Sequence, residues 1–382
     1  MKKRVMILGS TGSIGCRTLD VIRDFPDLFE VSGLSSLSKF GVLKEQVREF
    51  HPKAIAFGDM GKWEVVKNFA NQVGIQIFKG KDGLVKMVEE VETDIVVVAT
   101  VGSAGLFATL KAIALNHIIA LANKEVLVTA GHLVMKLARE KNVPILPIDS
   151  EHNAIFQCLI GQDKNAIRRI ILTASGGPFR KFSPEDLKNV SLKDTLDHPT
   201  WKMGPKITVD SATMMNKGFE VIEGKYLFDI SIDAIDVVIH PQSIIHSMVE
   251  FIDGSILAQL SRTDMYLPIQ NVLTYPERKK TTLEPLDLTT ISALSFEKPD
   301  LNIFPCLGFA YEAGRLGGTY PTALNASNEI AVERFLKEEI SFIDIPRIIE
   351  FVMKSHSNSS DPDLETIQET DKIAREMARN YV

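Results

Sequence analysis

The first 150 residues alternate short β-rich runs with stretches of helical spacing, and this alternation constrains the fold more than any other feature. The predicted strands are residues 4–8, 29–34, 54–57, 75–78, 94–99, 117–121 and a run near 144–148. Residues 95–99 are apolar without alternation, which is typical of a strand buried on both faces. The pattern predicts an α/β fold that opens with a doubly wound parallel sheet over residues 1–148.

The pattern changes at Asp149. Loops at 175–178 and 198–201 separate β-rich runs at 169–173, 234–240 and 255–260, which indicates a central α+β domain over residues 149–274. Residues 275–300 carry three prolines among polar residues and are predicted to form a linker. Helical spacing at 325–337, 345–354 and 363–379 predicts a C-terminal α-helical domain over residues 301–382.

Composition excludes several classes of protein. The net charge of −6 over 382 residues argues against a nucleic-acid partner, which normally requires a basic surface. No apolar run reaches the roughly 20 residues of a membrane span, and the start of the chain lacks a secretory signal. The three cysteines are widely separated and without CxxC spacing, so we expect a cytoplasmic protein without a disulfide framework.

A glycine-rich segment, Gly9 to Gly15 (GSTGSIG), lies between the first predicted strand and the first predicted helix. Glycines allow a tight turn, so a pyrophosphate can approach the free amides and the positive end of the helix. In this context the segment predicts a Rossmann-type dinucleotide site. The alternative is a glycine turn that binds no cofactor.

The end of the second predicted strand indicates which dinucleotide binds. An NAD enzyme usually places an acid there, whereas this chain has Ser36, Ser38 and Lys39. Hydroxyls and an ammonium can accept a 2′-phosphate, so the segment favours NADPH. The alternative is an exposed polar loop.

Two acids follow the last strand of the predicted sheet. In extended chain, Asp149 and Glu151 present their carboxylates to the same side and suit Mg²⁺ or Mn²⁺. A solvated loop or a helix cap by Asp149 or Ser150 explains the same residues. Further along, Asn216, Lys217 and Glu220 share one face if their segment is helical, which suits a phosphorylated polyol and a metal. An ordinary surface pair explains that spacing too.

Two loops offer a phosphate site and a lid. The loop that starts at Ser175 exposes a hydroxyl and backbone amides, while residues 198–204 combine His198, Trp201 and a terminal glycine. Trp201 could equally be a core aromatic, and His240 and His246 are expected to be structural.

The segments GSTGSIG, ANKE (122–125), DSEHNAIFQ (149–157), SGGPF (175–179), HPTWKMG (198–204), DSATMMNKGFEVIE (210–223) and HPQSIIHSMVEF (240–251) resemble the 1-deoxy-D-xylulose 5-phosphate reductoisomerase family. The resemblance extends over essentially the whole chain. It implies the conversion of 1-deoxy-D-xylulose 5-phosphate to 2-C-methyl-D-erythritol 4-phosphate with NADPH and Mg²⁺, Mn²⁺ or Co²⁺, in non-mevalonate isoprenoid biosynthesis. Members are homodimers, and the same is expected here.

The resemblance also implies roles for residues at matching positions. The metal ligands would be Asp149, Glu151 and Glu220, which with Lys217 and His198 form the catalytic set. Substrate contacts would come from Ser150, Glu151, Ser175, His198, Trp201, Met203, Ser211, Asn216, Lys217 and Glu220. Cofactor contacts would come from Thr11, Gly12, Ser13, Ile14, Ser36, Ser38, Lys39, Asn123, Lys124, Glu125 and Gly204. The chain departs from the family at 36–39, where a Gly-Lys-Asn type of sequence is more usual.

The implied mechanism has two stages. A metal on the carbonyl and adjacent hydroxyl oxygens stabilises charge while the carbon skeleton rearranges by retro-aldol and aldol steps. Hydride from NADPH then reduces the resulting aldehyde, with loop 198–204 excluding water. Two alternatives stay open: a semialdehyde dehydrogenase with Cys158 as nucleophile, and a non-enzymatic nucleotide-sensing module.

Overall fold

The computed structural model describes residues 1–201 and 203–381, without the side chain of Lys81, so Lys202 of the loop 198–204 lies outside the described residues. The chain forms two compact units. Unit 1 comprises Met1–Val126, Val134–Asn153 and Asp264–Glu284. Unit 2 comprises Leu127–Leu133, Ala154–Thr263 and Pro285–Val382.

Unit 1 is built on a seven-stranded sheet in the order β4-β3-β2-β1-β5-β6-β7. Its strands are β1 (Lys3–Leu8), β2 (Phe29–Ser36), β3 (Ala54–Phe57), β4 (Gln76–Lys79), β5 (Ile95–Val98), β6 (Ile118–Leu121) and β7 (Ile145–Pro147). Every neighbouring pair is parallel. All four residues of β5 are buried, as its unbroken apolar run predicts. The doubly wound sheet is therefore confirmed.

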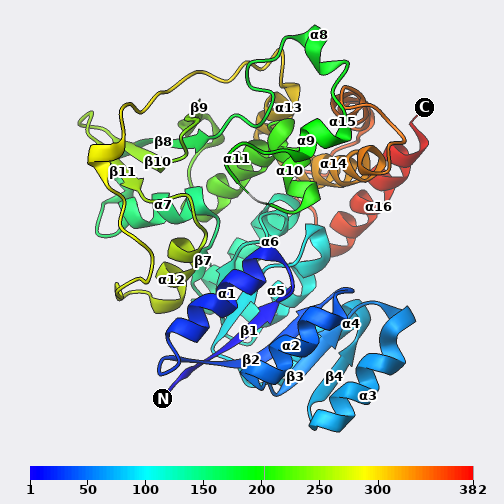
Figure 1. The fold of residues 1–382 in the computed structure, drawn as a ribbon. Coiled ribbons are helices and arrows are strands. Elements are labelled where there is room, and N and C mark those ends of the chain that lie inside the picture. Colours follow the sequence, from blue (N-terminus) through cyan, green and yellow to red (C-terminus); the bar gives the residue numbers. More distant parts are fainter. Residues whose placement is uncertain (202, 382) are drawn as a thin grey trace. The chain divides into compact units, whose positions relative to one another are not determined.

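Helices pack beside the sheet, and most of them connect its strands (Figure 1). They are α1 (Ser13–Asp24), α2 (Phe40–Phe50), α3 (Trp63–Val73), α4 (Gly80–Glu90), α5 (Leu106–Ala114) and α12 (Tyr266–Thr274), with 3-10 turns η1 (Met60–Lys62) and η2 (Gly102–Gly105). Residues of α6 (Glu125–Lys141) and α7 (Ser150–Leu159) contribute to both units. The strand order places β1 between β2 and β5, so the carboxyl ends of these strands form the switch point at which such sheets bind ligands.

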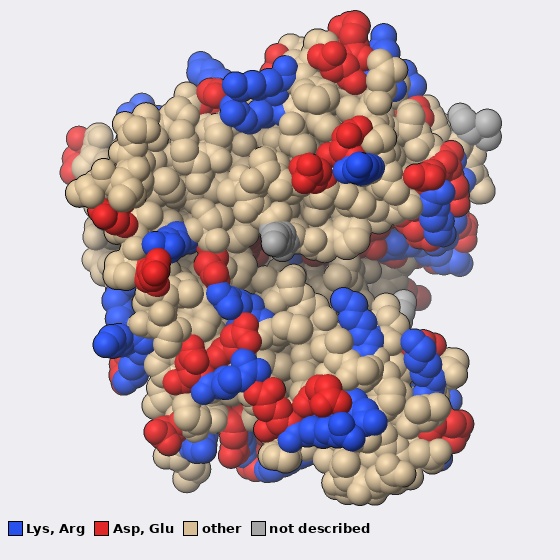
Figure 2. All heavy atoms as spheres, in the orientation of Figure 1, with Lys and Arg blue, Asp and Glu red and all other residues tan. Residues whose placement is uncertain are grey.

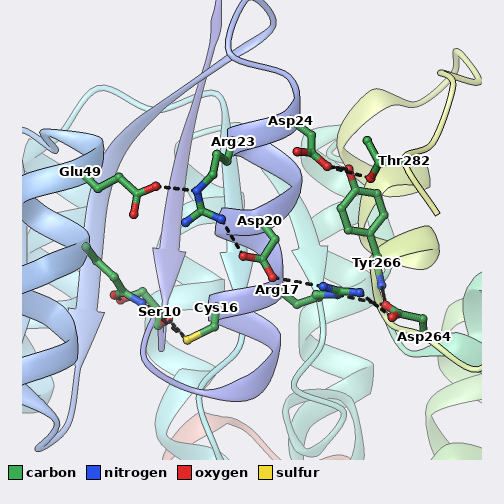
Figure 3. A network of polar contacts seen from close by, with 11 residues as sticks. Ser10, Cys16, Arg17, Asp20, Arg23, Asp24, Glu49, Asp264, Tyr266 and Thr282 are labelled. Carbon is green, nitrogen blue, oxygen red and sulfur yellow. Dashed lines mark hydrogen bonds and ion pairs between the residues drawn. The ribbon is translucent and has the colours of Figure 1, made fainter.

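A segment distant in sequence, Asp264–Glu284, packs onto α1 of unit 1. Arg17 donates to both carboxylate oxygens of Asp264, at 3.0 and 2.5 Å, and its guanidinium lies over the ring of Tyr266. The Tyr266 hydroxyl donates to Asp24 at 2.5 Å (Figure 3). The predicted division at 274 and 300 stays a prediction, but the compact units divide at 263 and 284 because these polar contacts hold the segment on α1.

Unit 2 contains a four-stranded sheet in the order β11-β10-β8-β9. Its strands are β8 (Ile167–Ala174), β9 (Ile235–Ile239), β10 (Ile245–Phe251) and β11 (Ile256–Leu260). Strand β10 pairs antiparallel with β8 and β11, whereas β8 and β9 run parallel. The sequence analysis predicted three of these strands and missed β10, although its buried apolar residues include Val249 and Phe251.

Helices supply most of the remaining core of unit 2. They are α8 (Pro184–Leu187), α9 (Leu192–Leu196), α10 (Pro205–Ala212), α11 (Met215–Phe228), α13 (Pro305–Leu316), α14 (Tyr320–Leu336), α15 (Asp344–Ser355) and α16 (Leu364–Asn380), with 3-10 turns η3 (Lys164–Ala166), η4 (Ile232–Ala234) and η5 (Leu288–Thr290). Phe219, Val249, Leu324 and Ile348 lie in one buried cluster that spans sheet and helices. The helical C-terminal part is as predicted.

Acidic and basic side chains are interspersed over the face that Figure 2 shows. Many are paired, as in the contacts Arg23–Glu49 and Arg169–Glu250. Among the helices that the structure describes, none combines the length and the apolar character needed to cross a bilayer.

We predict that Tyr266→Phe lowers the free energy of unfolding by about 1 kcal/mol, because the buried tyrosine loses its hydrogen bond to Asp24. Burial raises the pKa of Tyr266 to about 12. The stabilisation by the protonated Tyr266 hydroxyl is therefore fully present below the ordinary pKa of 10.0. It is lost as pH rises through the higher pKa of the folded protein. Urea unfolding at pH 7 measures the difference. Identical midpoints and slopes for variant and parent would contradict the role given to this contact.

Candidate active site

The glycine-rich turn of unit 1 fits a pyrophosphate. Gly9 has a φ of 91°, and a Cβ there would lie 2.5 Å from the carbonyl oxygen of Ala99. A Cβ on Gly15 would lie 2.4 Å from the carbonyl oxygen of Gly9. The N-cap Gly12 has no side-chain hydrogen bond, and the first turn of α1, which is fully described, contains no acid. The amides at this helix start are therefore available to an anion.

The candidate cofactor residues of the first strands lie near this turn. The Thr11 and Ser36 hydroxyls are 2.8 Å apart, and the backbone N–H of Lys39 donates to the Ser36 hydroxyl at 3.2 Å. Ser36 is buried, whereas Ser38 and Lys39 are exposed. Ser13 and Ile14 open α1, with Ser13 exposed. The β2 end thus presents hydroxyls and an ammonium, as the sequence predicted.

Asn123 and Lys124 lie between β6 and α6, Glu125 is the first residue of α6, and all three are buried. The Asn123 amide donates to the Thr100 hydroxyl at 2.9 Å and to the carbonyl oxygen of Gly102 at 2.8 Å, while its own buried oxygen has no hydrogen-bond partner in the described structure. Sequence reasoning missed Thr100. Its position two residues after the buried β5, at the carboxyl edge of the sheet, is the signal that could have identified it.

The backbone conformation of the two acids after β7 differs from the predicted extended chain. Asp149 follows the strand, but Glu151 lies in the first turn of α7, which begins at Ser150. The expectation of extended chain was wrong, because the backbone N–H of Asn153 bonds to the carbonyl of Asp149 and starts the helix. The Lys124 ammonium forms an ion pair with the Asp149 carboxylate at 2.5 Å. The Ser150 hydroxyl donates a hydrogen bond to the Glu151 carboxylate at 2.5 Å. Carboxylates, hydroxyl and ammonium thus cluster within unit 1.

In unit 2, the segment 210–220 forms two helices rather than one. Met214 adopts a left-handed conformation with a φ of 64° between α10 and α11. Within α11, the Asn216 amide donates to Glu220 at 2.6 Å, and the Lys217 ammonium contacts the other oxygen of the same carboxylate. Lys217 and Glu220 are both buried. The predicted sharing of one face by these three residues is thus present in the structure.

Three polar side chains converge beside these helices. The Nε2 atom of His198 lies 3.2 Å from the Ser175 hydroxyl and 3.1 Å from the Ser211 hydroxyl. Its Nδ1 atom accepts from the backbone N–H groups of Thr200 and Trp201, at 3.2 and 3.0 Å. Because Nδ1 accepts, Nε2 carries the proton of the neutral ring and donates to a serine hydroxyl.

The remaining predicted residues of unit 2 flank this cluster. Trp201 and Met203 are partly buried, and Gly204 is the N-cap of α10. Sequence reasoning missed Lys206, whose ammonium contacts the buried Asp210 at 2.7 Å. The spacing of four residues in one helix was the available signal.

Two other expectations concern residues outside the proposed chemistry. His240 is structural, as expected: one ring nitrogen lies 3.0 Å from the carbonyl oxygen of Ser295, and the other accepts the N–H groups of Ile244 and Ile245. Burial raises the pKa of the Cys158 thiol to about 11. A thiol that stays protonated at neutral pH is a poor nucleophile, which disfavours the semialdehyde dehydrogenase alternative.

The parallel sheet, its glycine turn and the acid-free β2 end define a dinucleotide-dependent oxidoreductase, to which unit 2 adds a cluster of hydroxyl, imidazole and ammonium donors. Three family models match the chain: "1-deoxy-D-xylulose 5-phosphate reductoisomerase" over residues 5–131, its "C-terminal domain" over 145–228, and "DXP reductoisomerase C-terminal domain" over 260–377. The chain belongs to the 1-deoxy-D-xylulose 5-phosphate reductoisomerase family.

Individual relatives agree with this assignment. The reductoisomerases of Thermoanaerobacter pseudethanolicus and Acetivibrio thermocellus are each 53% identical to this chain over 382 residues, with full coverage of both chains. The Zymomonas mobilis enzyme in complex with NADPH is 41% identical, with a TM-score of 0.92 and coverage of 99% of this chain and 98% of that chain. A DOX-P reductoisomerase in complex with NADPH, fosmidomycin and magnesium is 43% identical, with a TM-score of 0.94 and coverage of 99% and 97%.

We predict that the backbone at Thr200 and Trp201 loosens in acid. Burial lowers the pKa of His198 below its ordinary 6.5, so the neutral ring is favoured above that pH and is lost as pH falls through the lower, folded value. Protonation of Nδ1 removes the acceptor for Thr200 and Trp201. In a Trp63→Phe background, the fluorescence of Trp201 should change with a midpoint below pH 6.5, and His198→Gln should abolish the transition. The same transition in both proteins would rule out His198 as its origin.

Proposed function

We propose that this protein converts 1-deoxy-D-xylulose 5-phosphate to 2-C-methyl-D-erythritol 4-phosphate, with NADPH as the reductant, in non-mevalonate isoprenoid precursor synthesis. The observation that carries the proposal is the convergence of Ser175, His198 and Ser211 in unit 2, in a chain related to named reductoisomerases over its whole length. These side chains offer neutral donors at one point, which suits the oxygens of a phosphate.

NADPH is assigned to unit 1. The pyrophosphate is placed at Thr11, Gly12, Ser13 and Ile14, where the helix amides are available and the glycines permit close approach. The 2′-phosphate is placed at Ser36, Ser38 and Lys39. Asn123, Lys124 and Glu125 are assigned to the nicotinamide ribose, and the buried, unpartnered oxygen of Asn123 is a suitable acceptor there. Gly204 is assigned to the same cofactor from unit 2.

A divalent metal is assigned to Asp149, Glu151 and Glu220. The donor set fits, because carboxylate oxygens are the ligands that Mg²⁺ prefers and Mn²⁺ and Co²⁺ accept. The Asp149 side chain is 13% exposed and that of Glu220 is 1% exposed, and each of these shielded carboxylates has a cation beside it, Lys124 and Lys217 respectively. When bound, the metal supplies Lewis-acid stabilisation of charge on the substrate oxygens.

The substrate phosphate is assigned to the donors of unit 2. Lys217 contributes a fixed positive charge, while Ser175, Ser211 and Asn216 contribute hydrogen bonds. The Nε2 atom of His198 contacts the two serine hydroxyls, and its Nδ1 atom accepts the backbone N–H of Trp201. A phosphate bound at the serines would therefore also fix the position of Trp201. That loop, with Met203, then excludes water from the reacting carbons.

The remaining residues orient the chemistry. Ser150 lies between the two acids of unit 1 and is assigned to a substrate hydroxyl, with Glu151 as its present acceptor. Lys124 holds the Asp149 carboxylate in place through their ion pair. NADPH supplies the hydride, and the substrate carbon that accepts it must lie at the carboxyl edge of the unit 1 sheet, where Asn123 and Asp149 are both found.

We predict that Glu220→Gln lowers turnover on the order of a thousandfold, because it removes one of three charged ligands while keeping the shape of the side chain. NADPH oxidation with 1-deoxy-D-xylulose 5-phosphate and Mg²⁺ measures the loss, and a chelator should abolish the parent's activity. Glu312→Gln, on the exposed face of α13, is the matched control. NADPH affinity should not change in either variant, so its loss together with turnover would contradict a metal role.

We also propose that the protein is a cytoplasmic homodimer. Its three cysteines are free thiols, as expected in a reducing compartment. Strand β11 is a terminal strand of its sheet, and Ile252, Ile256 and Leu257 on this hairpin are 70%, 49% and 42% exposed. An exposed apolar edge strand favours pairing with another chain, and a second copy is the partner proposed here.

We predict that Ile256→Lys converts the dimer to a monomer, because it places a charge on the apolar edge. Light scattering after size-exclusion chromatography measures the mass. Leu288→Lys changes a leucine that lies outside the sheet and is 60% exposed, and it should leave the dimer intact. A parent protein that runs as a monomer, or an Ile256→Lys variant that remains a dimer, would exclude β11 as the interface.

A further inference from the structure

A second lysine reaches the loop that follows β2. Sequence reasoning assigned Ser36, Ser38 and Lys39 to this end of the strand, and Lys39 was its only cation. In the structure, the ammonium of Lys62 donates to the carbonyl oxygen of Ser38 at 3.3 Å. Lys62 is the last residue of η1, which follows β3, so it arrives from a different segment of the chain.

The position of Lys62 is fixed by backbone contacts between neighbouring strand ends. The N–H of Gly58 donates to the carbonyl of Ser36 at 3.0 Å, and that of Asp59 donates to the carbonyl of Leu37 at 2.7 Å. A Cβ at position 58 would lie 3.3 Å from the backbone of Leu37, so the two segments are in close contact here. The chain after β3 therefore runs against the chain after β2.

Aromatic packing holds the other side of the same loop. Phe40, the first residue of α2, packs edge-on against Phe57 of β3 at 6.2 Å and against Phe69 of α3 at 5.6 Å between ring centroids. Residues 37–39 thus connect a buried strand to an anchored helix start. The two lysines on this loop and beside it have little freedom to move apart at the backbone.

The charges around Lys62 leave it available to an anion. Its side chain is 56% exposed, and the nearest oxygen of Asp59 is 3.7 Å from the ammonium. An exposed pair at this distance contributes little, and the other Asp59 oxygen accepts the N–H of Gly61 at 2.9 Å. The ammonium can therefore turn towards a phosphate without breaking a strong contact.

We propose that Lys62 is a second cation for the 2′-phosphate of NADPH and so contributes to the choice of NADPH over NADH. A dianion beside Ser38 would have the ammonium of Lys62 close by and Lys39 as its neighbour in sequence, two cations that a ribose hydroxyl would not need. The inference rests on the proposed assignment of NADPH to this strand end. It explains how a chain with serines at 36 and 38 gathers more than one positive charge there.

The test compares Lys62→Gln with Lys53→Gln in the full-length protein. Lys53 is an exposed lysine at the amino end of β3, so the control removes the same charge at the opposite edge of the sheet. Titration of the fluorescence of NADPH and of NADH gives each dissociation constant without turnover. Lys62→Gln should weaken NADPH binding about threefold to fivefold, leave NADH binding unchanged, and lose most of this difference in 0.5 M salt.

Lys62→Arg should restore NADPH affinity, since it returns the charge. Equal NADPH affinities for Lys62→Gln and Lys53→Gln would overturn the proposal, and so would an equal loss of NADH affinity in Lys62→Gln. Absence of turnover on 1-deoxy-D-xylulose 5-phosphate by the parent would instead defeat the proposed function, because the binding measurements assess Lys62 independently.

Discussion

Buried charge must be paired, and this requirement shapes both halves of the proposed site. In unit 1, Lys124 contacts Asp149, and both side chains are almost completely shielded from solvent. In unit 2, Lys217 contacts Glu220, and these two side chains are also shielded from solvent. Removing one member of such a pair costs several kcal/mol, so each ion pair keeps a carboxylate and an ammonium in place while no ligand is present. In the proposed site, a divalent cation would join the acids and the substrate phosphate would contact Lys217.

In the proposed mechanism, unit 1 binds the dinucleotide and unit 2 binds the substrate phosphate. Unit 1 offers a helix start with available amides and a strand end with hydroxyls and lysines, which together suit a phosphorylated dinucleotide. Unit 2 offers His198, whose two nitrogens connect a pair of serine hydroxyls to the backbone of its own loop. Because that single ring joins the proposed phosphate donors Ser175 and Ser211 to the backbone of Trp201, we expect phosphate binding to fix the position of Trp201.

Most of the fold could be predicted from periodicity, because most strands of unit 1 contain a short apolar run between helical patterns. Strand β10 was not predicted, because polar residues such as His246 and Ser247 interrupt its apolar pattern. Both residues are buried by contacts that only the folded sheet provides. The conformation of Glu151 could not be read from spacing, since the choice between extended chain and helix depends on the bond from Asn153 to Asp149. Lys62 could not be found from motifs, because it is distant from Ser38 in sequence. The pairing of β2 with β3 in the sheet brings the two residues together.

We propose that Asp149, Glu151 and Glu220 bind one divalent ion. Electron paramagnetic resonance of Mn²⁺ added to the full-length protein, with Asp149→Asn and Glu220→Gln as variants, measures this directly. The account predicts one tight site per chain in the parent, weakened at least about tenfold by either substitution. If Glu220→Gln retained the parent's affinity while Asp149→Asn lost it, the ion would belong to unit 1 alone and the claim would be wrong.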